Sequence, residues 1–361
     1  MIRFSEMVLP GHPDKFCDQI ADAVVAECYR ADPEAYAQVE VAVWSDQLWL
    51  SGGVCTRQPI ARSLEEIVRE VGLAIGYRPD NAIDVDRYCI SSTVCFRLGD
   101  PRQWTHHVND QSIVCGWAGY DAATAWLPPE HYLAHCFREA LTTACRSGVL
   151  AGQGPDGKLL LRMREEGSRW VLEHLLVTLQ QQAAWSFMDF CALLAGVLEQ
   201  AYEAVRTADP RWVAPWGSVA VLLNPNGPLL KGGSDGDNGQ TGRKPVMDYY
   251  GPRVPLGGGA LSGKDIAHVD RLGAYAAREA AVRAVRSGAK ECLVRLAWAP
   301  NVGEPMAVVW EMEGRGERQP RHFFSHDRLR SVYDGRWVTA DLARGRHFLD
   351  GDMPWNAAEA G

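Results

Sequence analysis

The run GGSDGDNGQTGRK at residues 232–244 decides how this chain is interpreted. Its five glycines leave little side chain to pack, so backbone N–H groups can approach a ligand closely. Arg243 and Lys244 close the run, and Asp235 and Asp237 lie inside it. Amides and cations hold phosphate oxygens while a carboxylate holds Mg²⁺, so this composition is typical of a site for a polyphosphate with its metal ion. A flexible surface loop is the alternative, and the spacing is not that of a GxxxxGK[ST] loop.

The same combination of glycine, cation and carboxylate occurs twice more. The run GGGALSGKD covers residues 257–265, and the run GHPDK covers residues 11–15. Three such runs in one chain favour a phosphate-binding function over three unrelated surface loops.

The size and charge of the chain limit the possible functions. Its 361 residues predict two or three domains, and 47% hydrophobic with 23% charged residues is an ordinary globular balance. The formal net charge of −8 argues against non-specific nucleic-acid binding. A polyphosphate must therefore be held by a local cluster of cations.

Cysteine usage and the N-terminus bear on the compartment. None of the ten cysteines forms a CxxC pair, and most lie in apolar segments, so we expect buried free thiols in a reducing compartment. The start Met-Ile-Arg-Phe-Ser-Glu has no apolar signal core, and no run of about eighteen apolar residues occurs. We therefore expect a cytoplasmic protein that does not span a membrane.

Hydrophobic periodicity predicts an α+β fold. Clean alternation and short hairpins favour antiparallel sheets with helices on one face. Helices are predicted at about 13–30, 61–75, 129–147, 185–206 and 267–287, and strands near 38–44, 48–50, 158–164, 170–179, 218–223, 292–298 and 305–312. We divide the chain into an N-terminal α+β domain (1–96), a short lid loop (97–112), a central α+β domain (113–222) and a C-terminal α+β domain with the glycine-rich loops (223–361).

Several acidic side chains have two interpretations each. Asp14, Asp18 and Asp22 are four residues apart on the first predicted helix, and we expect Asp22 to face solvent. Asp14 differs because it lies at the helix N-terminus, where phosphate and metal would gather. Glu40, in the middle of a predicted strand, either faces solvent or binds a cation. Asp156 is either turn chemistry or part of the site.

With these motifs assembled, the chain resembles the S-adenosylmethionine synthetase (methionine adenosyltransferase) family. The resemblance is carried, in order, by GHPDK at 11–15, DQ at 110–111, PDGK at 155–158, GDNGQTGRK at 236–244, and GGGALSGKD at 257–265 with VDR at 269–271. It implies three similar domains of antiparallel sheet plus helices around a pseudo-threefold axis. It also implies a homodimer or dimer of dimers, with flat sheet faces buried and active sites at the subunit interface.

The resemblance implies a reaction and roles for its residues. Methionine sulfur attacks C5′ of ATP, and the triphosphate leaves and is cleaved to phosphate and pyrophosphate. By resemblance, the phosphate chain is bound by His12, Lys15, Lys158, Arg243, Lys244 and Lys264, with His12 near the breaking bond. Asp14 and Asp270 are implied as Mg²⁺ ligands and Glu40 as a K⁺ ligand. Asp110 and Asp237 are implied to receive the amino acid and the nucleoside, and Asp156 to lie with them at the substrates.

The departures from the family gather where the organic substrates would bind. Val54 follows Gly52-Gly53 where the family has a glutamate, and His268 replaces a lysine. Leu229 stands where the family stacks an aromatic residue on the base, and Asn301 replaces an apolar residue on its other face. Loss of a stacking platform costs on the order of 1–3 kcal/mol per base, by analogy with other base-stacking aromatics.

These departures leave three interpretations open. The chain is a true methionine adenosyltransferase with drifted pockets, or it performs the same chemistry with a non-adenine nucleoside triphosphate or another thioether amino acid. The third interpretation is a catalytically silent regulatory homologue, although such a copy has no need for the whole phosphate set. A generic phosphotransferase outside the family would need a hydroxyl acceptor with a catalytic base, and we identify no such pair.

Overall fold

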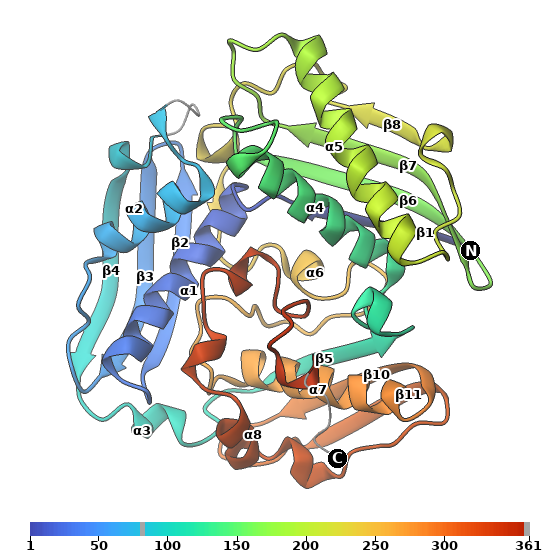
Figure 1. Cartoon of the computed structure of the whole chain (residues 1–361). Coiled ribbons are helices and arrows are strands. Elements are labelled where there is room, and N and C mark those ends of the chain that lie inside the picture. Colours follow the sequence, from blue (N-terminus) through green and yellow to red (C-terminus); the bar gives the residue numbers. More distant parts are fainter. Residues whose placement is uncertain (80–83, 357–361) are drawn as a thin grey trace.

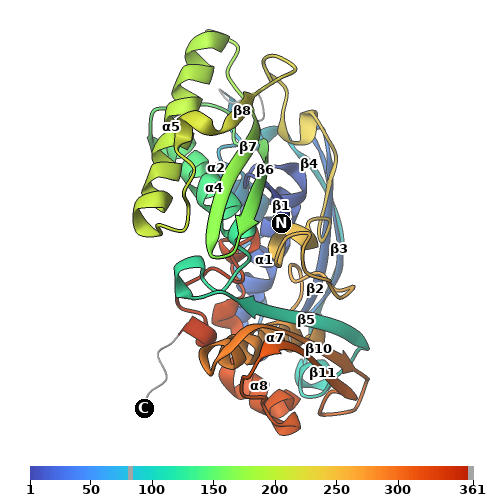
Figure 2. The ribbon, with the colours of Figure 1, turned by 90° about the vertical axis from the view of Figure 1, so that its right-hand side faces the viewer.

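The structure, a computed structural model, describes residues 1–79 and 84–356. Three sheets, each with helices on one side, surround the centre of the molecule (Figure 1). The turned view places the helices on one side of the molecule and the sheets on the other (Figure 2). This arrangement confirms the α+β class.

The first unit consists of strands β2 (Tyr36–Trp44), β3 (Gln47–Thr56), β4 (Cys89–Leu98) and β9 (Gly239–Gln240), with helices α1 (Pro13–Ala31) and α2 (Leu64–Ile75). Strands β2 and β3 form the expected hairpin, whereas β4 joins β3 in parallel. Helix α2 begins with a capping box between Ser63 and Glu66 and ends at Gly76, whose φ of 99° suits glycine.

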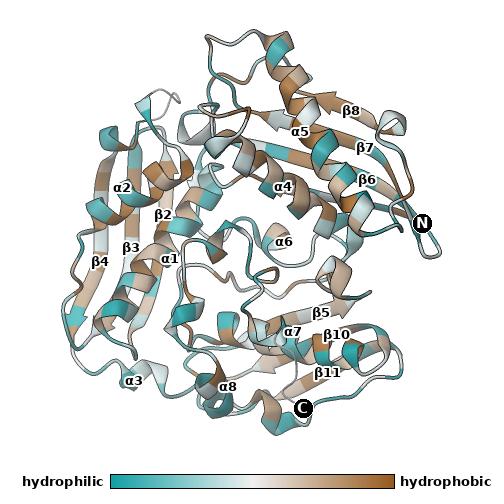
Figure 3. Ribbon diagram, in the orientation of Figure 1, coloured by the Kyte–Doolittle hydropathy of each residue, from teal (hydrophilic) through white to brown (hydrophobic). Residues whose placement is uncertain are grey.

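The second unit consists of strands β1 (Ile2–Val8), β6 (Gly157–Glu166), β7 (Arg169–Leu179) and β8 (Ala220–Leu223), with helices α4 (Pro129–Ser147) and α5 (Phe187–Ala208). Its strands are coloured mostly brown in Figure 3, and one face of the sheet lies in an apolar core. Helix α5 buries Phe190, Leu194 and Leu198 at helical spacing. These side chains share one apolar core with β6 and β7.

The third unit consists of strands β5 (Ser112–Gly119), β10 (Ala289–Trp298) and β11 (Ala307–Gly314), with helices α7 (Val269–Arg286) and α8 (His326–Val332). Helix α7 is buried along most of its length and packs on β5 and β10. The apolar core of this unit is continuous with that of the first unit.

Each of the three sheets contains a strand from a distant part of the sequence. The N-terminal strand β1 pairs with β6 in the second unit, and β5 pairs with β10 in the third. The short strand β9, inside the glycine-rich run, pairs with β2 in the first unit. The division predicted from the sequence, with boundaries at residues 96, 112 and 222, assigns one contiguous segment to each domain. We propose instead three units that each include one strand from a distant part of the sequence.

Several local expectations are changed by the structure. Asp22 does not face solvent: it is fully buried and ion-paired with the equally buried Arg271 at 2.7 Å, so that prediction was wrong. The segment 97–112 contains a short helix, α3 (Arg102–Thr105), and packs Trp104 against Tyr36. All ten cysteines are free, but Cys89 and Cys95 are exposed rather than buried. Across the described part of the chain, the helices are all too short or too polar to cross a membrane.

Candidate active site at the N-terminus of α1

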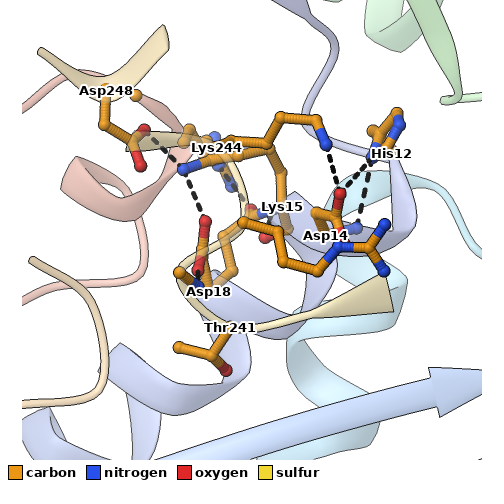
Figure 4. A network of polar contacts seen from close by, with 12 residues as sticks. His12, Asp14, Lys15, Asp18, Thr241, Lys244 and Asp248 are labelled. Carbon is orange, nitrogen blue, oxygen red and sulfur yellow. Dashed lines mark hydrogen bonds and ion pairs between the residues drawn. The ribbon is translucent and has the colours of Figure 1, made fainter. Parts of the chain in front are cut away.

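Helix α1 begins at a histidine cap. The Nδ1 atom of His12 accepts the backbone N–H of Asp14 at 3.2 Å, and Pro13 occupies the first turn, where its missing N–H is not needed. The cap places the side chains of His12 and Asp14 at the N-terminus of the helix, where the helix dipole is positive. Figure 4 shows them beside side chains from the glycine-rich run.

Asp14 is the centre of a basic cluster. Its fully buried carboxylate accepts the backbone N–H of Gln240 at 2.9 Å and forms an ion pair with Lys244. Arg243, which is exposed, approaches the other carboxylate oxygen at 3.4 Å. The glycine-rich run at 232–244 is therefore folded back on the start of α1.

His12 is held in its neutral form. Its pKa is lowered to about 4, chiefly by burial and also by the charge of Lys244, against the opposing charge of Asp14. Because Nδ1 accepts a hydrogen bond, we assign the ring proton to Nε2. His12 can thus donate one hydrogen bond to an oxyanion without carrying a charge.

Lys15 does not join the phosphate-facing cations. It is buried, and its Nζ donates to Asp248 at 2.6 Å and to Asp18 at 2.8 Å (Figure 4). Asp18 in turn accepts the backbone N–H of Gly242 at 2.8 Å. This inward pairing makes Lys15 a residue that positions the glycine-rich run, and its expected contact with phosphate stays a prediction.

Asp156 also supports the glycine-rich run. Its half-buried carboxylate accepts the backbone N–H of Gly233 at 2.7 Å, and removal from solvent raises its pKa to about 6. Lys158 on β6 and the exposed Asp237 lie near enough to His12 to act electrostatically on its imidazole, in opposite senses. The structure therefore gathers these residues beside the cap of α1.

A second cluster lies at the N-terminus of α7. Lys264 forms an ion pair with Asp270, which also accepts the hydroxyl of Ser112 at 2.5 Å. The Nδ1 atom of His268 accepts the backbone N–H of Asp270 at 3.2 Å, and its Nε2 lies 3.6 Å from the carboxylate of Asp110. The lid segment thus ends beside the second cluster.

The two clusters share a local design. In both, a histidine at the helix cap accepts from the N–H of an aspartate two residues later, and that aspartate pairs with a lysine of a glycine-rich run. This repeat was not predicted from the sequence, although the pattern His-x-Asp before an apolar-periodic segment occurs at both places. Ser112 and Asp248 were not predicted either, because neither has a local signal.

Strand β2 connects the clusters. Ala42 pairs with Gln240 near the first cluster, and Gln38 forms a bridge to Lys264 of the second. Four residues of strand separate these contacts, which is about 13 Å. Glu40 lies between them on the exposed face of the strand. One extended ligand could therefore reach both clusters along this strand.

The residues that depart from the family lie in different surroundings. Val54 is buried in the core of the first unit, so the expected contact with substrate is corrected to a packing role. Leu229 is half-buried, and its carbonyl accepts the N–H of Gln181 at 2.9 Å. Asn301 is exposed with a φ of 59°, and its N–H donates to the carbonyl of Val108.

The donor set around the clusters suits a metal shared with phosphate. Among the described residues, no group of three or more His, Cys, Asp or Glu side chains is arranged around one point. Mg²⁺ in nucleotide sites typically takes one or two carboxylates, with phosphates and waters completing its shell. Asp14 and Asp270, each beside a lysine, fit that pattern, and Glu40 offers a further carboxylate.

Comparison with family models gives two matches. Residues 1–95 match the model of the S-adenosylmethionine synthetase N-terminal domain, and residues 231–336 match that of its C-terminal domain. The match therefore includes both glycine-rich runs and the cap of α1.

Relatives match over most of the chain. It is 34% identical over 329 residues to S-adenosylmethionine synthase 1 of Rhodospirillum rubrum, covering 86% of this chain and 80% of that protein. It is 36% identical over 325 residues to S-adenosylmethionine synthase of Methylobacterium nodulans, covering 87% and 81%. A solved structure described as an unusual S-adenosylmethionine synthetase from Campylobacter jejuni has a TM-score of 0.84 at 22% identity, covering 99% of this chain and 97% of that one, and supports the fold.

Proposed function

This chain belongs to the S-adenosylmethionine synthetase family, the methionine adenosyltransferase enzymes, and from that premise we propose that it transfers the nucleoside of a nucleoside triphosphate, ATP in the first instance, to the sulfur of methionine. The product is a sulfonium such as S-adenosylmethionine, with phosphate and pyrophosphate released. The observation that carries this proposal is the basic cluster around Asp14 at the N-terminus of α1.

The chemistry explains why cations matter more than a base. A thioether sulfur is neutral and carries no proton, so its attack on C5′ needs no general base. The barrier lies in the departing triphosphate, whose developing negative charge must be stabilised by fixed donors and by positioning. The neutral His12 fits the place near the breaking bond, because it can donate from Nε2.

The paired carboxylates and cations suggest how ligands are received. Lys244 and Lys264 are each neutralised by an aspartate, and the exposed Arg243 lies beside the first pair. Polyphosphate oxygens would take these cations together with Lys158, leaving Asp14 and Asp270 to hold Mg²⁺. When bound, the metal would neutralise phosphate charge. We propose Glu40 as a ligand for K⁺.

We place the organic substrates at either end of the phosphate site. Asp110, beside His268, is our candidate for the amino acid, and Asp237 is our candidate for the nucleoside. A second candidate function is favoured by Leu229 and Asn301, because neither side chain supplies an aromatic platform on which adenine could stack. The alternatives are a non-adenine nucleoside triphosphate or another thioether amino acid. A silent regulatory homologue is disfavoured by the two intact clusters.

We also propose an assembly. Large apolar side chains are exposed on the sheets, among them Phe4, Trp44 and Trp49. A homodimer, or a dimer of dimers, that covers these faces agrees with an active site at the subunit interface.

One incubation series tests the proposed function. The enzyme is supplied with Mg²⁺, K⁺, methionine and each nucleoside triphosphate in turn, and sulfonium products are identified by mass while phosphate and pyrophosphate are measured separately. We expect a sulfonium with ATP. Exclusive use of ATP would end the altered-base alternative, and absence of a sulfonium with every nucleotide and every thioether amino acid tried would overturn the proposal.

A further inference from the structure

A cavity of about 220 Å³ lies between the first and second units, beside the segment of chain that leads to His12. Its lining comes from the ends of α2 and α4, from the chain before His12, and from Arg344 near the C-terminus. Drug-sized ligands occupy pockets of about 300–1,000 Å³, so this cavity suits a smaller molecule.

The charges on the lining have one sign. Arg78, Arg146 and Arg344 line the cavity, and among the described lining residues there is no carboxylate. Arg344 is paired with Asp341 at 3.0 Å, whereas the exposed side chains of Arg78 and Arg146 make no ion pair or hydrogen bond with residues 1–79 and 84–356. Burial lowers the pKa of Arg344, and the charge of Arg146 adds to that effect. Two exposed arginines without a partner side chain among the described residues therefore line one small cavity.

A buried amide supplies a further donor. Gln153 is 2% exposed and lines the cavity, and its Oε1 accepts the backbone N–H of Gln182 at 2.9 Å. That contact fixes the orientation of the amide, so the donor is Nε2, which has no hydrogen-bond partner among the residues that the structure describes. A buried donor without a partner is destabilising, and an acceptor in the cavity would offset that cost.

We propose that this cavity is a binding site for a small dianion of the pyrophosphate class. Two guanidinium groups provide forked donors for phosphate-type oxygens, and the Gln153 amide provides a third. The aliphatic floor, which includes Leu9, Leu73 and Ile75, leaves these donors with few competing acceptors.

The position of the cavity gives the anion access to the catalytic side. Pro10 and Pro155 form part of its wall, and they immediately precede the segments that carry His12 and Lys158. The wall is stiff, because the hydroxyl of Tyr77 donates to the carbonyl of Gly11 at 2.6 Å and a Cβ at Gly11 would meet Pro155 at 2.4 Å.

The test is calorimetric titration of the full chain with pyrophosphate in the absence of Mg²⁺. The phosphate clusters also attract this anion, so we expect two classes of site. The variant Lys158→Gln with Lys264→Gln should lose one class, and Arg78→Gln with Arg146→Gln should weaken the other at least about tenfold. Arg315→Gln with Arg318→Gln is the matched control: both side chains are exposed, and the net charge changes equally.

The outcomes separate this inference from the proposed function. The inference would be overturned if the titration shows a single class of site that Arg78→Gln with Arg146→Gln leaves unchanged. It would also be overturned if the control variant loses the same affinity, because that would indicate only an effect of net charge. If the double variant fails to fold, Ala74→Trp fills the cavity instead and should abolish the same class. The measurement needs no turnover, so it stands whether or not a sulfonium is formed.

Discussion

Lys264 is the residue whose removal best separates binding from chemistry. Its Nζ pairs with Asp270, and in the proposed reaction it stabilises charge that develops on the departing polyphosphate. We expect Lys264→Ala to lower kcat about 100- to 1,000-fold, as for loss of one oxyanion donor, with the KM for methionine changed only a few-fold. Lys290→Ala removes an exposed lysine paired with Glu313 and serves as the control. Unchanged turnover in Lys264→Ala would remove this lysine from the leaving-group role.

Asp156 predicts a pH dependence of stability. Burial raises its pKa from 3.8 to about 6, so the folded protein binds more protons than the unfolded chain between these values. Asp156 therefore contributes most to the free energy of unfolding below pH 3.8, where it is protonated in both states. That contribution decreases by about 3 kcal/mol as the pH rises from 3.8 to 6, and it does not change further above pH 6. Asp156→Asn should lack this term.

The measurement is urea unfolding of the wild type and Asp156→Asn between about pH 4 and pH 7. Because other groups titrate alike in both proteins, the difference in free energy of unfolding isolates Asp156. We expect the variant to gain relative to the wild type as the pH rises. A difference that does not depend on pH would show that the carboxyl is not perturbed in the native state.

At the scale of elements, the packing of β5 on α7 gives a sharp prediction. A Cβ on Gly116 would lie 2.0 Å from the carbonyl carbon of Ala277, and backbone cannot yield as a side chain can. We expect Gly116→Ala to destabilise the protein by about 1–3 kcal/mol in thermal or urea unfolding. Gly258→Ala is the control, because no atom of the described residues lies within 4 Å of its Cβ position, and it should be nearly neutral. Equal stability of the two variants would contradict the packing.

The elements also show how far local sequence patterns determine the fold. Helices α1, α4, α5 and α7 were predicted because each carries an apolar face at helical spacing, which is local information. Strands β1, β4 and β5 were not, and β4 shows why: at the edge of its sheet it is exposed along nearly its whole length, so it has no alternation to detect. The pairing of strands that are distant in the sequence cannot be predicted from local sequence patterns.

The site was predictable to the same degree. Glycine-rich composition located the runs that meet Asp14 and Asp270, because close approach of backbone to a ligand is a local requirement. The inward pairing of Lys15 with Asp248 and of Asp22 with Arg271 was not, since each joins residues more than 200 positions apart. Acidic residues spaced four apart on a helix have the same sequence pattern whether they face solvent or form buried ion pairs.

At the scale of the whole molecule, the exposed apolar sheet faces require an explanation. Trp44 on β2 and Trp49 on β3 are 52% and 46% exposed on the same face of the first sheet, and Phe4 on β1 is 56% exposed on the second. Single exposed apolar residues are ordinary, but aromatic residues spread over two neighbouring sheets are typical of a surface covered by a partner. A second copy of the chain related by a twofold axis would cover them with the same surface.

We therefore expect Trp44→Glu with Trp49→Glu to weaken self-association at least about tenfold, because buried aromatic residues at interfaces commonly contribute about 2 kcal/mol or more each and a buried charge adds a further cost. Sedimentation velocity over a concentration series measures this directly. Met188→Glu, on the helical side of the molecule and 77% exposed, is the control and should associate like the wild type. If the active site lies at the subunit interface, turnover per chain in the double variant should fall on dilution in step with the dimer fraction. A wild-type chain that is monomeric at micromolar concentration, yet fully active, would exclude both the interface and the shared site.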